Sequence, residues 1–309
     1  MEKLINFDIL FDKRLSEFIS KNDITTSKET ALSIINDYED KEWRYECFMN
    51  FIWDNIIETA LSKKEREAIV DSPHSVLADA AKNLRLIDSD TDTGKGSEIA
   101  EILLYGILKH HYKTLSIVPK IFYKQNSNDF VKGADSVHIF LNEENNDFSL
   151  WFGEAKFYKT IEDSRLAEIV TSVGNMLQAD KIKKENKIIT NLKELELCIH
   201  NKELCEKVIK CLSGSVSLDY IRPRLHIPIL LLYECEITAR YNEKSKEYTD
   251  EIMKYHYERA EVYFRKQINA LSDIPKYEEA HFHFIIFPVP NKKSIVDRFI
   301  NQAKTYRGR

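Results

Sequence analysis

A pair of strand-like segments joined by a polar turn limits the possible folds of this chain more than any other feature. The first segment covers residues 136–140 and directly follows Asp135, and the second covers residues 149–156. Apolar segments of this length on either side of a short polar run predict a β-hairpin. Side chains alternate between the two faces of a strand, so Glu154 and Lys156 are expected on the same face.

Two carboxylates and an ammonium at one edge of a sheet are the groups that metal-assisted cleavage of a phosphodiester requires. Asp135 and Glu154 are predicted to bind Mg²⁺ or Mn²⁺, which prefer oxygen ligands and which activate a water and neutralise charge on the phosphate. Lys156 is predicted to stabilise the developing negative charge or to orient the water. The predicted fold class is therefore α/β, with a nuclease core of the PD-(D/E)XK type in which helices flank a mixed sheet. The structural alternative is that Asp135 hydrogen-bonds a turn while Glu154 and Lys156 form a surface pair of little energetic weight.

A helix that precedes the hairpin offers a third acid for the metal site. Ser97 is predicted to cap this helix, which runs from Glu98 to about His111. Glu98 and Glu101 are three residues apart and therefore share one side of the helix. Either acid is a candidate for the catalytic set, and Glu101 is favoured as the metal ligand because it lies deeper in the apolar part of the helix.

The charge balance restricts how the chain binds nucleic acid. With 45 basic and 50 acidic residues, the net charge is -5, which excludes a generally basic nucleic-acid binder. Binding to DNA must then depend on a local basic groove, a metal or a partner. Lys132, Lys159 and Arg165 flank the hairpin and are candidates for contacts with phosphates. The alternative for Lys159 and Arg165 is that they are solvated surface side chains.

The chain is predicted to divide near residue 90, within a polar loop that covers residues 86–97. Residues 1–90 are predicted to form a helical N-terminal region, part of whose aromatic surface is a candidate for docking a partner protein. Residues 91–309 are predicted to form the nuclease domain, with a helical insertion near residues 185–215. In this domain, the apolar run 227–234 is expected to be a buried central strand.

A helix is also predicted near the start of the chain. Thr26-Ser27-Lys28-Glu29 has the form of a helix start, with a cap and a nearby acid. Leu32, Ile34, Ile35 and Tyr38 would then supply the buried face of this helix.

Other potential sites are weaker. The five cysteines form no Cys-x-x-Cys pair and no even framework, which indicates a reduced, cytoplasmic protein. His281 and His283 share one strand face and resemble metal ligands, but no third ligand is evident, so ordinary strand histidines are favoured. The start of the chain has no signal-peptide pattern. The longest apolar run in the whole sequence, Ile229 to Tyr233, is too short to span a bilayer, so no membrane partner is expected.

Three segments together resemble a known family, the HamA/AbpA proteins. They are Gly133-Ala134-Asp135, Trp151-Phe152-Gly153-Glu154-Ala155-Lys156 and the helix start Gly96-Ser97-Glu98-Ile99-Ala100-Glu101. Members of this family are the nuclease-like subunits of the Hachiman and Abp anti-phage defence systems, and the order of elements over residues 70–300 is similar. The resemblance implies a divalent-metal-dependent DNase whose catalytic set is Asp135, Glu154 and Lys156. It also implies a separately encoded superfamily 2 helicase as partner, HamB in Hachiman.

Two alternatives to this function stay open. The chain could be an interaction subunit that uses a nuclease-like fold to bind and restrain the helicase, with little or no cleavage of its own. A stand-alone restriction enzyme is less favoured, because no separate module for reading DNA is visible in the sequence.

Overall fold

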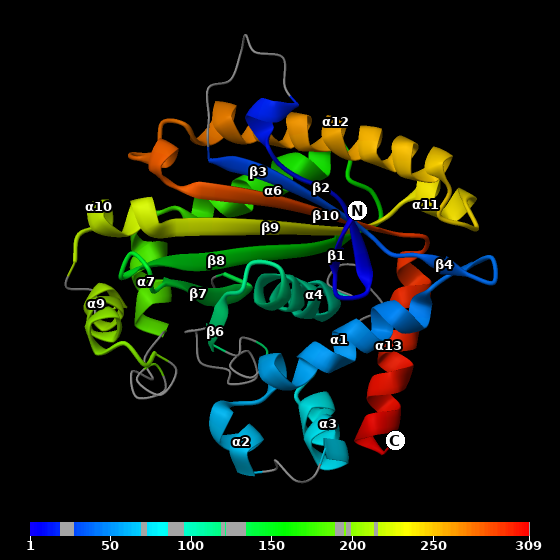
Figure 1. Ribbon diagram of the computed structural model, residues 1–309, viewed down its shortest axis with the longest axis horizontal. Coiled ribbons are helices and arrows are strands. Elements are labelled where there is room, and N and C mark those ends of the chain that lie inside the picture. The colour runs from blue at the N-terminus through cyan, green and yellow to red at the C-terminus, as the bar shows by residue number, and fades with distance from the viewer. Residues whose placement is uncertain are drawn as a thin grey trace.

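A mixed β-sheet forms the centre of the computed structural model, which describes residues 1–18, 28–68, 73–85, 96–118, 121, 134–188, 195, 199–212 and 216–308. Its eight strands are β1 (Glu2–Leu4), β2 (Phe7–Arg14), β3 (Glu29–Ile35), β6 (Leu115–Val118), β7 (Ser136–Asn142), β8 (Asp147–Tyr158), β9 (Leu225–Glu234) and β10 (His281–Val289). They lie in the order β1-β2-β3-β10-β9-β8-β7-β6 (Figure 1). A separate two-stranded ribbon consists of β4 (Tyr38–Glu39) and β5 (Glu42–Trp43).

Four parallel strands make up the middle of the sheet. β3, β10, β9 and β8 run parallel to their neighbours, and antiparallel pairs extend the sheet at both edges. β9 lies between β10 and β8 and is buried on both faces, which explains its nearly continuous apolar sequence. β7 and β8 form the expected antiparallel hairpin. The predicted α/β class, with a mixed sheet flanked by helices, is confirmed.

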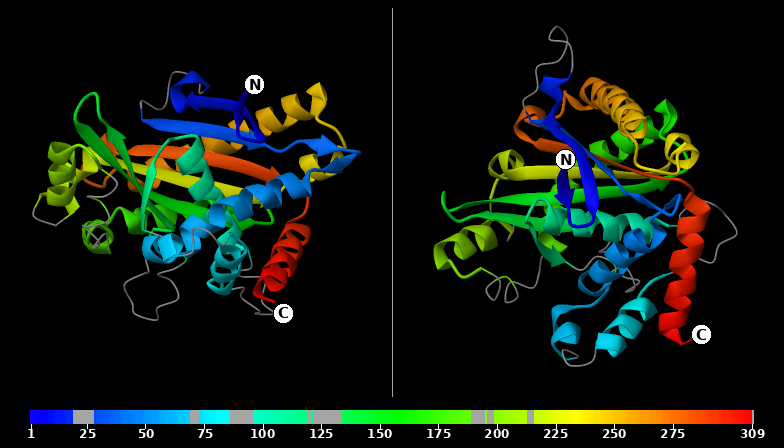
Figure 2. Two further views of the ribbon diagram at one scale, coloured as in Figure 1. Left: turned by 60° about the horizontal axis from the view of Figure 1, so that its bottom comes forward. Right: turned by 45° about the vertical axis from the view of Figure 1, so that its right-hand side comes forward.

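Helices cover both faces of the sheet and create two apolar cores. One core contains residues of α1 (Tyr45–Ala60), α3 (Pro73–Lys82), α4 (Ser97–His110) and α13 (Lys292–Arg307). The other contains residues of α6 (Asp163–Met176), α7 (Ala179–Ile188), α9 (Lys202–Leu212) and α12 (Lys246–Leu271). Figure 2 shows α1 and α13, in blue and red, on one side of the sheet and the orange α12 on the other. Three shorter helices are α2 (Lys63–Ala68), α10 (Leu218–Ile221) and α11 (Glu236–Arg240).

The two cores show which way each side chain of β8 points. Trp151, Ala155 and Phe157 belong to the core that contains α4. Leu150 and Phe152 belong to the core that contains α6 and α12. Because side chains alternate along a strand, Glu154 points to the side of α6 and α12.

The helical prediction for the start of the chain is wrong. Residues 2–14 and 29–35 form strands β1, β2 and β3, and the first long helix, α1, begins only at Tyr45. β3 lies between β2 and β10 inside the sheet, so Leu32 and Ile34 are buried in one core while Ala31 and Ile35 are buried in the other. A strand buried on both faces loses the alternation that identifies strands, and its apolar spacing then resembles a helix.

Further along the N-terminal region the structure is helical as predicted, with α1, α2 and α3 between Tyr45 and Lys82. Residues 86–95, where the domain boundary was predicted, lie outside the described residues. β3 and β8 nevertheless belong to one sheet, so the start of the chain shares that sheet with the hairpin. None of the described helices is both long and apolar enough to cross a membrane.

Candidate active site

Asp135 lies where the hairpin opens. The register of β7 with β8 ends at the pair Ser136 and Gly153, so β8 continues past the start of β7. The backbone N–H of Asp135 donates to the carbonyl oxygen of Gly153 at 2.7 Å. Its Oδ2 accepts a hydrogen bond from the backbone N–H of Ala155 at 3.1 Å. These two hydrogen bonds hold the carboxylate beside the part of β8 that carries Glu154.

Both acids converge on Lys156. The ammonium of Lys156 lies 2.5 Å from Oε1 of Glu154 and 3.6 Å from Oδ2 of Asp135. The side chain of Glu154 is 6% exposed and that of Asp135 is 16% exposed, whereas Lys156 is 33% exposed. The hairpin therefore gathers the predicted catalytic set into one largely buried cluster.

Ser172 on α6 also belongs to this cluster, and this role was not predicted from the sequence. Its hydroxyl donates a hydrogen bond to Oε1 of Glu154 at 2.6 Å. A signal was present in the sequence, because Ser172 lies three residues after Ile169 and next to Val173, on the buried side of an amphipathic helix. A polar residue in that position needs a polar partner on the sheet.

The electrostatics of the cluster keep Lys156 positively charged. Burial lowers the pKa of Lys156, but the carboxylates of Asp135 and Glu154 outweigh this effect and hold the pKa above its usual range. Burial and the nearby Asp135 raise the pKa of Glu154, against the opposing influence of Lys156 and Ser172. The two carboxylates therefore favour the positively charged form of Lys156.

The donor set fits a hard divalent cation. Two carboxylates face one position, and Mg²⁺ in proteins is commonly held by one or two carboxylates, with water or phosphate oxygens at the other positions. Among the described residues, no group of three or more His, Cys, Asp and Glu side chains is placed to hold a metal ion. Within this part of the chain, Asp135 and Glu154 are therefore the ligands available to an ion beside Lys156.

The structure does not place the helical acids on the face of Glu154. A Cβ atom on Gly153 would lie 2.7 Å from Cδ2 of Leu104, which shows that α4 packs on the face opposite to Glu154. Glu101 is buried on this helix. Glu98 accepts a hydrogen bond from the backbone N–H of Arg85 at 2.8 Å. The roles predicted for both acids stay predictions.

The candidate phosphate contacts are only partly visible. Lys132 lies outside the described residues. Arg165 is paired with Glu168 at 2.9 Å, and its guanidinium lies 5.4 Å from the ring centre of Tyr158, at the end of β8. Lys159 follows Tyr158 and is exposed. The contacts predicted between these cations and nucleic acid also stay predictions.

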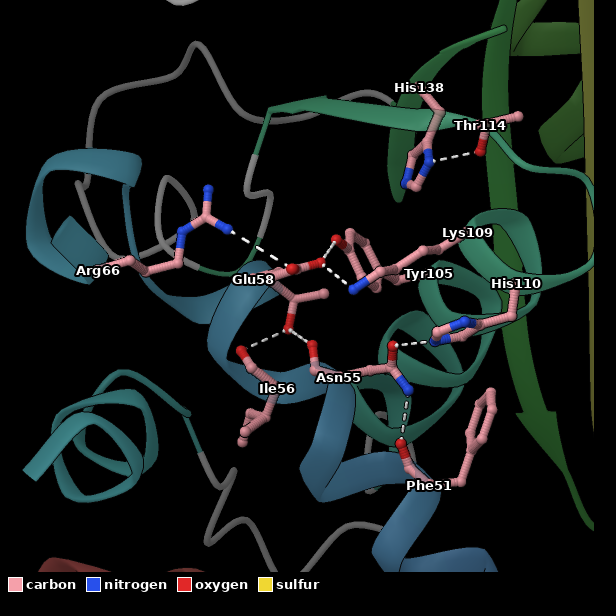
Figure 3. Close-up of polar contacts among 11 residues, drawn as sticks. Phe51, Asn55, Ile56, Glu58, Arg66, Tyr105, Lys109, His110, Thr114 and His138 are labelled. Atoms are coloured by element: carbon pink, nitrogen blue, oxygen red, sulfur yellow. Dashed lines mark hydrogen bonds and ion pairs between the residues drawn. The ribbon is translucent and has the colours of Figure 1, made fainter. Parts of the chain in front are cut away.

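A second polar cluster, which the sequence analysis missed, links α1 and α2 to α4. Figure 3 shows Glu58 between Arg66 on one side and Tyr105 and Lys109 on the other. Glu58 accepts a hydrogen bond from Lys109 at 2.8 Å and another from the hydroxyl of Tyr105, while Arg66 lies 3.9 Å away. Burial raises the pKa of Glu58, but the hydrogen bonds from Lys109 and Tyr105 outweigh it and hold the pKa below its usual range. With its charge compensated on both sides, Glu58 fixes the position of the helix behind the hairpin.

Comparison with known families places the candidate site within a family match. The family model described as HamA matches residues 11–303, which extend from β2 into α13 and include the whole candidate site. No curated protein matches the chain.

Proposed function

We propose that this chain, which belongs to the HamA family of Hachiman defence-associated proteins, is a metal-dependent DNA endonuclease subunit. In this proposal it acts with a helicase of the same defence system. The observation that carries this proposal is the convergence of Asp135 and Glu154 on Lys156. These three groups supply two oxygen ligands and a fixed positive charge on one face of β8, which is the minimum that hydrolysis of a phosphodiester needs.

Each residue of the cluster has a distinct part in the proposed reaction. Asp135 and Glu154 would hold Mg²⁺ or Mn²⁺, which when bound would supply Lewis-acid stabilisation of the phosphate and activate a water for attack. Lys156 stabilises the negative charge that develops on the phosphate oxygens. Ser172 fixes the orientation of the Glu154 carboxylate through its 2.6 Å hydrogen bond. Two backbone hydrogen bonds do the same for Asp135.

The charge of the chain supports a division of labour with a partner. A net charge of -5 opposes tight binding to the DNA backbone, because that affinity depends on the number of phosphates neutralised by Lys and Arg. A helicase that holds the DNA would present it to the Asp135–Glu154–Lys156 cluster at high effective concentration. The affinity for DNA would then reside mainly in the partner.

A second candidate function, restraint of the helicase without cleavage, rests on the small number of acids in the cluster. Within the described residues, two carboxylates meet there, while Glu101 lies on a helix on the opposite face of β8. If two carboxylates do not hold a metal, the nuclease-like fold would serve only to bind and restrain the helicase.

Nicking of supercoiled plasmid tests both functions. The full chain would be assayed alone and with the helicase, in Mg²⁺, Mn²⁺ and EDTA, and protection against phage would be measured in parallel. Glu154→Gln and Lys156→Met should abolish nicking and protection. The matched control is Lys293→Met, because Lys293 forms an exposed surface pair with Asp297 at 2.5 Å.

The results separate the candidates. Nicking and protection that survive in the Glu154→Gln, Lys156→Met double variant would overturn the nuclease proposal. Absence of nicking in every metal, combined with full protection by the double variant, would favour restraint of the helicase.

A further inference from the structure

A pocket lies at the turn end of the hairpin, where β8 begins at Asp147. Tyr158 lies at the other end of this strand. This cavity of about 390 Å³ is called here the hairpin pocket. It lies on the face of the sheet that α4 covers, where β8 and β9 extend to the left of α4 in Figure 1. Its lining consists of five ring-bearing and three polar side chains, Tyr112, Phe140, Phe148, Trp151, His226, Asn142, Asp147 and Ser149.

We propose that the hairpin pocket binds a base of single-stranded nucleic acid. The inference goes beyond the proposed nuclease activity and does not depend on it. A base needs flat rings to stack on and a few hydrogen-bonding groups for its edge, and only an unpaired base can leave its own stack to enter such a pocket.

The rings of the pocket belong to a stacked series that crosses the sheet. Trp151 lies 4.4 Å from His226 with an interplanar angle of 21°, and His226 lies 4.3 Å from His281 with an angle of 3°. Tyr112, which follows the end of α4, lies 4.9 Å from Trp151. Burial and the neighbouring His283 lower the pKa of His226 to about 2, so this imidazole is uncharged at neutral pH. The wall of the pocket is therefore aromatic and carries no charge on its rings, which suits a base.

Polar groups stand beside these rings at the tip of the hairpin. Asn142 and Asp147 face each other as a register pair, and Asn142 receives a hydrogen bond from the backbone of Asn145 through its side-chain oxygen. Its amide NH₂ group is thus oriented as a donor. The hydroxyl of Ser149 accepts from the indole of Trp151 at 2.8 Å and keeps its own proton to donate. The edge of a base, with its own donors and acceptors, complements this mixture better than an apolar side chain does.

The charges near the pocket tolerate a phosphate backbone. Asp147 forms an ion pair with Arg224 at 3.2 Å, which offsets its negative charge. Lys113 follows Tyr112 in the chain and is exposed. Trp151 precedes Glu154 by three residues, or roughly 10 Å of strand, and their side chains point to opposite faces.

Binding in EDTA tests the proposal without any cleavage. The probe is a fluorescein-labelled oligothymidylate, with anisotropy and quenching of tryptophan fluorescence as the two readouts and the same oligonucleotide annealed to its complement as competitor. Phe140→Leu keeps an apolar side chain but removes a ring, and Asn142→Ala removes the amide. Phe140→Leu should weaken binding about fivefold or more, since a stacked base commonly contributes that much, whereas Phe140→Trp should retain it. Asn142→Ala should weaken binding about fivefold through loss of a hydrogen bond to the base. Tyr306→Ala, on α13, is the control and should bind as the wild type does.

Several outcomes would overturn the proposal. These are no binding by the wild-type chain, equal binding by Phe140→Leu, Asn142→Ala and wild type, or competition by duplex as strong as by single strand. Unchanged oligonucleotide binding by Phe140→Leu together with loss of helicase association would instead make the pocket a protein-docking site. A thermal melt of each variant checks its fold, and Asn142→Ala at the exposed turn keeps the test decisive if Phe140→Leu unfolds.

Discussion

Acid should destabilise this protein sharply between pH 7 and pH 5, because three histidines are buried without charge. Burial lowers the pKa of His138, His256 and His283 to about 3 in each case. His256 is the clearest example, since it is fully buried and its two ring nitrogens lie 2.6 Å from the hydroxyl of Ser33 and 2.8 Å from that of Tyr233. In a neutral imidazole one nitrogen must accept a hydrogen bond, and protonation would remove that acceptor.

The direction of this change in stability follows from the different proton affinities of the folded and unfolded states. The unfolded chain binds a proton at each histidine below about pH 6.5, whereas the folded chain does not do so until about pH 3, so the free energy of unfolding falls as the pH falls through this range. Each histidine then costs about 2 kcal/mol at pH 5 relative to pH 7. Three of them cost about 6 kcal/mol, against a total stability of about 5–15 kcal/mol for ordinary domains. His226 is left out of this sum because it shares a hydrogen bond with His283.

Urea unfolding followed by tryptophan fluorescence at pH 7, 6 and 5 measures this loss. The urea concentration at the midpoint of unfolding should fall steeply as the pH is lowered. The slope of the free energy of unfolding against urea concentration should stay constant. His256→Gln should be less stable at pH 7 but should lose about 2 kcal/mol less between pH 7 and pH 5, since one proton no longer binds on unfolding. His200→Gln, at an exposed position, is the control. Equal free energies of unfolding at pH 7 and pH 5 would refute the reasoning.

Three further substitutions test other parts of the structure. Ser172→Ala should lower the rate of metal-dependent plasmid nicking about tenfold through loss of a charge-assisted hydrogen bond to Glu154, with Ser172→Thr restoring it; equal rates in all three proteins would show that Ser172 does not position Glu154. Glu58→Gln should lower the free energy of unfolding by about 1–3 kcal/mol, measured in urea at pH 7, and an unchanged midpoint would contradict its role in fixing α4. Gly106→Ala should cost about 1–3 kcal/mol in the same assay, because the new Cβ would lie 2.5 Å from the ring of the buried Phe51; a fully stable variant would show that α1 and α4 can separate easily.

The hairpin and its charged cluster could be predicted because their determinants are local. A polar turn between two apolar segments defines the hairpin, and the two-residue period of a strand places Glu154 and Lys156 on one face. Ser172 belongs to a distant helix, and only its polar character on a buried stripe could have identified it. The sequence of β3 predicts a helix because its burial on both faces depends on β10, which follows it by some 250 residues.

Features that depend on pairing between distant strands could not be predicted. The face on which α4 packs is a property of the assembled sheet, so the sequence could not show that Glu101 lies opposite to Glu154. The ring series has the same origin, because His226 and His281 meet only through the register of β9 with β10. Read in isolation, His281 and His283 resembled a fragment of a metal site. In the folded chain His281 stacks on His226, and His283 is hydrogen-bonded to that same ring.

The position of β10 also determines when this chain can fold during its synthesis. β10 lies between β3 and β9, so the N-terminal strands have no connection to the rest of the sheet until residues 281–289 have been made. Until then, β3 and β9 each present an open edge, which is a template for pairing with another chain. Contacts of such long range are also slow to form. A nascent chain should therefore depend on chaperones over most of its length, and any truncation that removes β10 should aggregate, even though it retains Asp135, Glu154 and Lys156.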